Sequence, residues 1–117
     1  MIIKNERFKQ SILSALADKE MLNILNTAMY KSVSINEIIK EANIPHTTAY
    51  RKIKSMVENG LVIVEKIKIT DDGKKFSLFR STLRSINVKY EDNNVIVEAE
   101  KNVDTLAKMT EYFFSLD

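Results

Sequence analysis

Five polar side chains share one face of a helix predicted over residues 46–59. At 100° per residue they fall within an arc of about 140°, and none of them carries a carboxylate. Each can donate a hydrogen bond or contact a base or a phosphate, which is the chemistry required where a helix meets a nucleic acid. The members of this set are His46, Thr47, Tyr50, Arg51 and Lys54.

The order of these residues along the helix suggests separate roles. His46 and Thr47 stand at the N-terminus, from which base edges are usually reached. We expect Arg51 and Lys54 to contact phosphates, and Arg51 can also read guanine. Tyr50 is suited to a base or a phosphate, and equally to packing against the hairpin that follows. The alternative for the whole set is an ordinary solvated helix face.

A second group of cations lies along the predicted hairpin over residues 61–83. We expect these side chains to lie beside phosphates, because a hairpin that follows a groove-binding helix is placed to flank the bound backbone. The alternative is that lysines protect an exposed edge strand from aggregation. The group consists of Lys66, Lys68, Lys74, Lys75 and Arg80.

The charge distribution fits this placement. The net charge of the chain is only +2, but residues 34–85 hold 10 basic and 6 acidic residues, whereas residues 86–117 hold 3 basic and 7 acidic residues. A basic middle segment favours contact with a polyanion.

Local signals predict the elements that position these side chains. Ser34 and Glu37 form a capping box for a short helix, which ends at Asn43 before Pro45. The next helix begins near Pro45 or His46 and ends at Gly60. Alternating apolar residues then predict two strands around the turn that ends in Asp72-Gly73.

Further elements flank this unit. Asn5 and Asp18 are predicted to cap two N-terminal helices, and a second hairpin follows the first, with strands around 86–90 and 95–99. Asn102 or Asp104 is suited to cap a last helix. We therefore predict an α+β fold: a winged helix-turn-helix with N-terminal helices, an extra β-hairpin after the wing and a C-terminal dimerisation helix.

The predicted C-terminal helix has a different character from the rest. We divide the chain into residues 1–101, the winged helix-turn-helix domain with its extended wing sheet, and residues 102–117, an amphipathic helix. Its apolar stripe favours pairing with a second copy, and the alternative is packing onto its own core. The stripe consists of Leu106, Met109, Phe113 and Leu116.

Composition excludes several classes of chemistry. The chain has no cysteine, a single histidine, His46, two glycines and one proline. These numbers exclude thiolate metal sites, iron–sulfur clusters and a glycine-rich phosphate loop. We predict no cofactor, no metal and no enzymatic activity. No apolar run is long enough to span a membrane and no secretory signal is visible, so we expect a cytoplasmic protein.

The stretch from Ser34 to Arg84 resembles winged-helix regulators of the broad ArsR-like group, especially small archaeal members. The resemblance rests on three runs, 34–39, 44–53 and 58–62, and Leu83-Arg84-Ser85-Ile86-Asn87-Val88 also looks like those proteins. It implies a cytoplasmic, dimeric, sequence-specific DNA binder. Metal sensors of that group use cysteine ligands, and their absence here argues against metal sensing of that kind.

We therefore predict a homodimeric transcriptional regulator that binds a specific sequence in double-stranded DNA. Whether it responds to an effector is not indicated by the sequence. Helix 46–59 would enter the major groove, and the wing would follow the flanking backbone. The main alternative is a winged helix that contacts another protein of the transcription machinery. RNA binding is a weaker alternative, because the wing offers no run of aromatic residues for base stacking.

Overall fold

The computed structural model describes residues 1–102. The predicted C-terminal helix, with Leu106, Met109, Phe113 and Leu116, lies outside the described residues. The described elements are α1 (Glu6–Leu16), α2 (Lys19–Thr27), α3 (Ile35–Ala42), α4 (His46–Glu58), β1 (Val62–Ile69), β2 (Lys75–Ser81), β3 (Leu83–Glu91) and β4 (Asn94–Lys101).

Side-chain caps start the first three helices where the sequence predicts them. The carboxamide of Asn5 accepts a hydrogen bond from the amide of Phe8, at 2.9 Å. Asp18 accepts one from the amide of Met21, at 3.0 Å. Ser34 forms the complete capping box with Glu37. These caps satisfy amide groups that have no partner within a helix.

Left-handed residues end the two helices of the helix-turn-helix. Asn43 has φ 53° after α3, and Gly60 has φ 80° after α4. Beyond α4, the amide of Leu61 donates to the carbonyl of Met56 and the amide of Gly60 donates to the carbonyl of Val57. This is the Schellman pattern, and it turns the chain directly from α4 into β1.

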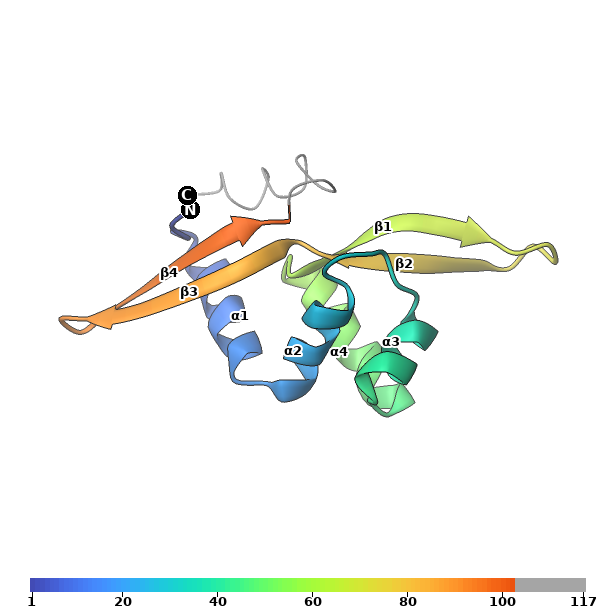
Figure 1. Ribbon diagram of the computed structural model, residues 1–117, viewed down its shortest axis with the longest axis horizontal. Helices are drawn as coiled ribbons and strands as arrows, with labels where there is room; N and C mark the ends of the chain where they lie inside the picture. The colour runs from blue at the N-terminus through green and yellow to red at the C-terminus, as the bar shows by residue number, and fades with distance from the viewer. Residues whose placement is uncertain (103–117) are drawn as a thin grey trace.

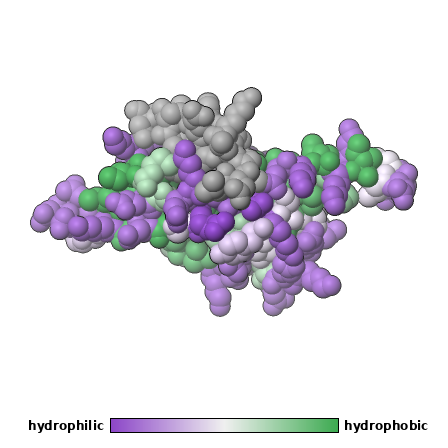
Figure 2. All heavy atoms as spheres, turned by 45° about the horizontal axis from the view of Figure 1, so that its top comes forward, coloured by the Kyte–Doolittle hydropathy of each residue, from purple (hydrophilic) through white to green (hydrophobic). Residues whose placement is uncertain are grey.

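The four strands form two separate antiparallel hairpins. The β1–β2 hairpin, the wing, turns at Gly73 with φ 85° and contains a β-bulge between Val64 and Lys66. The β3–β4 hairpin turns at Asp92 and Asn93, whose positive φ values are those of a type I′ turn. The hairpins project in opposite directions (Figure 1), and hydrophobic residues reach the surface along both (Figure 2).

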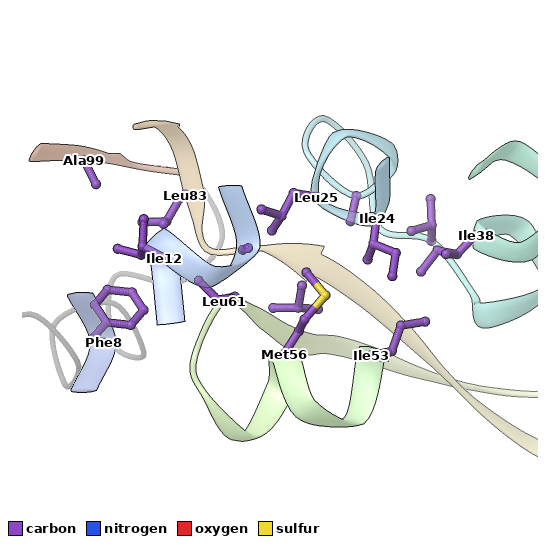
Figure 3. Close-up of a cluster of buried hydrophobic side chains, with 14 of the residues drawn as sticks. Phe8, Ile12, Ile24, Leu25, Ile38, Ile53, Met56, Leu61, Leu83 and Ala99 are labelled. Atoms are coloured by element: carbon purple, nitrogen blue, oxygen red, sulfur yellow. The ribbon is translucent and has the colours of Figure 1, made fainter. Parts of the chain in front are cut away.

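One hydrophobic core joins all the helices to the roots of both hairpins. Ile12, Ile24, Ile38 and Met56 come from α1, α2, α3 and α4 and are fully buried. Leu83 of β3 and Ala99 of β4 lie at the α1 end of the same cluster (Figure 3). Each large buried aliphatic side chain contributes about 1.5–3 kcal/mol to folding.

The segment after α2 attaches the wing to the helices. Val33 and Phe79 exchange two backbone hydrogen bonds, and the amide of Ser81 donates to the carbonyl of Ala28. The order of helix, turn, helix, strand, turn and strand is therefore that of a winged helix within an α+β fold, as predicted. Within residues 1–102, no helix is long and apolar enough to cross a bilayer.

Candidate nucleic-acid interface

The outward face of α4 is open to solvent. His46, Thr47, Tyr50, Arg51 and Lys54 are all exposed, and Tyr50 retains 49% of its accessible surface. The rings of His46 and Tyr50 are in contact in a tilted arrangement, with their centroids 4.7 Å apart and their planes at 46°. The structure therefore presents all five residues on one accessible surface, which we call the α4 ridge. None of the five carries a carboxylate, and the exposed Glu58 follows Lys54 one turn later at the C-terminal end of the same face.

The opposite face of α4 is fixed to the body by apolar residues and one cation. Ala49, Ile53 and Met56 are buried, and so is Lys52. The ammonium group of Lys52 donates to the carboxylate of Asp18 and lies 3.2 Å from Glu20, at the start of α2. Lys52 was missed by the sequence analysis, although its position on the helical wheel next to Met56 and Ala49 indicates an inward direction.

The Asp18–Lys52 pair shifts both pKa values. The hydrogen bond from Lys52 is the main cause that lowers the pKa of Asp18, and the amide of Met21 adds to it. The same hydrogen bond raises the pKa of Lys52, against the effect of its burial. Both groups are therefore held in their charged forms, and together they set the position of α4 relative to α2.

A cleft of about 980 Å³ separates the α4 ridge from the wing. Its floor is apolar, with Ile35 at the start of α3, Val64 from β1 and Phe79 from β2. Tyr50 and Lys54 line its α4 side, and Lys74 and Lys75 line its wing side. Two carboxylates, Glu37 and Glu58, line it as well. The cleft thus has a nonpolar base and walls in which three lysines outnumber two carboxylates, a balance that favours a sugar–phosphate strand.

The wing cations do not all face this cleft. Lys75 pairs in register with Ile69, on the face that also holds Val64 and Phe79, which we call the inner face. Lys66 and Lys68 pair with Leu78 and Phe76, on the opposite, outer face. Lys74 and Lys75 therefore line the cleft together with Lys54, whereas Lys66 and Lys68 are not among its lining residues.

The tip of the wing also carries negative charge. Asp71 and Asp72 are exposed there, and Lys74 lies 4.0 Å from Asp72. The hydroxyl of Thr70 donates to Asp72 and is the main cause of the lowered pKa of this carboxyl group. Because carboxylates at the tip repel phosphate, Lys75 on β2 is better suited to backbone contact than Lys74, which lies in the turn beside Asp72.

Arg80 lies elsewhere than the sequence analysis expected. Its Nε donates to the carbonyl of Met29 at 3.0 Å, and its guanidinium forms an ion pair with Glu65 at 3.5 Å. Only 14% of the Arg80 side chain and 11% of the Glu65 side chain are exposed. The guanidinium is therefore engaged at the root of the wing, and we leave Arg80 out of the interface.

The comparisons with known proteins agree with this architecture. A family model described as the sugar-specific transcriptional regulator TrmB matches residues 16–82, which include the helix-turn-helix and the wing. No curated protein and no solved structure matches the chain. The match confirms a winged-helix transcriptional regulator, and not an enzyme, but it does not support the expected ArsR-like affiliation.

Proposed function

The chain belongs to the TrmB family of transcriptional regulators, and from this premise we propose that it reads a specific DNA sequence as a homodimer. In this proposal α4 enters the major groove. His46 and Thr47 meet base edges, and Arg51 meets a guanine or a phosphate. The observation that carries the proposal is the exposed α4 ridge, whose five side chains include no carboxylate, beside a cleft in which lysines outnumber carboxylates.

The cleft supports a particular path for the DNA. Its opposing cations, Lys54 on α4 and Lys74 and Lys75 on the wing, suit one phosphate strand that passes between the helix and the hairpin. Lys66 and Lys68 lie on the outer face, so we expect them to contribute less to DNA affinity.

The homodimer is proposed from the C-terminal sequence. Residues 102–117 follow the domain of residues 1–101, and their apolar stripe (Leu106, Met109, Phe113 and Leu116) suits a two-fold contact. Such a dimer would present two α4 ridges to half-sites about 34–36 Å apart. We place the protein in the cytoplasm, together with its DNA.

The proposal is tested by selecting bound duplexes from a random pool and measuring affinity for the selected site at several salt concentrations. The double variant Arg51→Ala, Lys54→Ala should bind about tenfold or more weakly. Each lost phosphate contact should also reduce the slope of log affinity against log salt by about 0.9.

Lys89→Ala is the matched control, because Lys89 is an exposed lysine on the other hairpin. We expect it to leave both affinity and salt slope unchanged. A folded Arg51→Ala, Lys54→Ala variant with wild-type affinity would exclude α4 from the interface. Failure to select any duplex would favour a winged helix that contacts protein instead.

A further inference from the structure

The outer face of the wing root is buried without a helix over it. Ile63 and Leu78 expose only 5% and 6% of their surface, yet neither belongs to the hydrophobic core that the helices share. Helices α1 to α4 all lie on the other side of the wing (Figure 1). Helices α1 to α4 therefore do not account for the burial of these two aliphatic side chains.

The chain leaves its described part beside this face. Asn102 is 1% exposed, and its Nδ2 donates to the carbonyls of Met29, at 2.7 Å, and Ser81, at 2.9 Å. Ser81 is the last residue of β2, next to Arg80 on the outer face. Among residues 1–102, the buried Oδ1 of Asn102 has no hydrogen-bond partner.

The unpaired side-chain oxygen of Asn102 is suited to cap the N-terminus of a helix that begins directly after this residue. Asparagine is among the preferred N-cap residues, and its side-chain oxygen accepts from the backbone amide two or three positions further on. A buried acceptor without a partner costs about 1–3 kcal/mol. Amides of the residues that follow Asn102 would remove this cost.

The sequence of residues 103–117 fits the outer face in length. Fifteen residues wound as a helix span about 22 Å, close to the roughly 23 Å of the seven-residue strand β2. Their apolar residues would cover an arc of about 160°. These are Val103, Leu106, Met109, Phe113, Phe114 and Leu116.

Charge is complementary as well. Residues 103–117 contain three carboxylate side chains, Asp104, Glu111 and Asp117, and one lysine, Lys108. The outer face carries Lys66 and Lys68, which pair in register with Leu78 and Phe76. An acidic segment would meet these two lysines beside the apolar pair, Ile63 and Leu78.

We propose that residues 103–117 dock as a helix on the outer face of the wing root of their own chain, with Asn102 as the N-cap. Ile63 and Leu78 pack against one side of its wide apolar arc, and the rest of the arc stays available for a second copy. The surface that joins two protomers would then rest directly on the wing.

Cysteine cross-linking tests this placement, because the chain has no cysteine of its own. Leu78→Cys is combined in turn with Leu106→Cys, Met109→Cys or Phe113→Cys. The control combines it with Lys108→Cys, which lies on the polar side of the proposed helix. A disulfide requires Cα atoms within about 7 Å. We expect at least one apolar position to link within the chain far more efficiently than the control.

Gel mobility without reductant distinguishes links within a chain from links between chains. Equal yields at Lys108→Cys and at the apolar positions would overturn the proposal. Links found only between chains would do so too, because the covering segment would then come from a second copy. The cross-linking experiment and its gel analysis contain no DNA. Their result therefore does not depend on whether the proposed DNA recognition is correct.

Thiol reactivity gives a second measurement in case a double variant folds poorly. The single thiol of Leu78→Cys should react with a maleimide about tenfold or more slowly than when Phe113→Asp is added, because a covered thiol reacts only on local opening. Ser115→Asp, on the polar side of the segment, is the control and should leave the rate unchanged. Equal rates in all three chains would refute the docking.

Discussion

At the scale of single residues, Arg80 was expected to contact DNA but instead binds groups of its own chain. It connects β2 to Met29 after α2 and to Glu65 beside the β-bulge of β1. Glu65 also accepts a hydrogen bond from Ser32. This network holds both wing strands against the segment after α2, so it fixes the direction in which the wing projects.

Replacing Arg80 with methionine should destabilise the protein by about 2–4 kcal/mol, because Glu65 would remain buried without a counter-charge. Chemical denaturation measures this loss, and adding Glu65→Gln should recover part of it. The salt slope of DNA binding should stay that of the wild type, since no phosphate contact is removed. A salt slope lower by about 0.9 would show that Arg80 contacts a phosphate in the complex.

Asp18 makes stability depend on acid pH. Because Lys52 lowers the pKa of Asp18 below its ordinary 3.8, the ion pair stabilises the fold fully above that pH. The stabilisation is lost as the pH falls through the lowered pKa. Asp18→Asn keeps an N-cap but removes the charge, so it should cost about 1 kcal/mol at neutral pH.

This cost should shrink as denaturation is repeated at successively lower pH values, starting at 3.8 and passing through the lowered pKa of Asp18. In a Lys52→Met background, Asp18→Asn should have a smaller effect, since only the backbone hydrogen bonds of Met21 and Glu20 then favour the charged form of Asp18. A cost that is independent of pH would show that the Asp18 charge does not stabilise the fold.

Sequence reasoning located the α4 ridge but not the partners of Lys52 and Arg80. The ridge follows from helical periodicity, which is a local property of residues 46–59. Lys52 meets Asp18 and Arg80 meets Met29 across the fold, over 34 and 51 positions along the chain. Such contacts depend on how the elements pack, which spacing along the chain does not reveal.

At the scale of elements, helix ends determine the geometry of the winged helix. Asn43 and Gly60 were both predicted as stops, because left-handed backbone favours these two residue types. The capping residues Asn5, Asp18 and Ser34 were predicted for the same local reason. The split of the wing lysines between two faces was not, because the bulge after Val64 changes the alternation of β1.

Gly60→Ala tests the turn between α4 and the wing. A Cβ at φ 80° is strained, so we expect a loss of about 1 kcal/mol in the free energy of unfolding. Asn59→Ala is the control, since Asn59 has an ordinary φ of −93°, and it should change stability by less than about 0.5 kcal/mol. Equal losses would indicate that the left-handed turn is not the source of the effect.

At the scale of the whole molecule, the proposed dimer sets both affinity and target symmetry. The pair Phe113→Asp, Leu116→Asp should convert the protein to a monomer in sedimentation experiments, because charges would occupy the apolar stripe. Binding to a palindrome should then weaken towards that of one half-site. Ser115→Asp is the control, and a wild-type chain that sediments as a monomer would contradict the dimer.

The outer part of the wing, which projects beyond the helices, affects how the protein behaves without DNA. The segment after α2 pairs with the edge of β2 at Phe79 and Ser81, through Val33 and Ala28. Further out, Ile67 and Ile69 are exposed on the inner face of the wing. Long exposed strands with apolar side chains recruit strands from other molecules. Lys66, Lys68 and Lys75 oppose this by mutual repulsion between copies, which added salt screens. Without DNA, concentrated stocks should therefore become more prone to self-association as ionic strength rises.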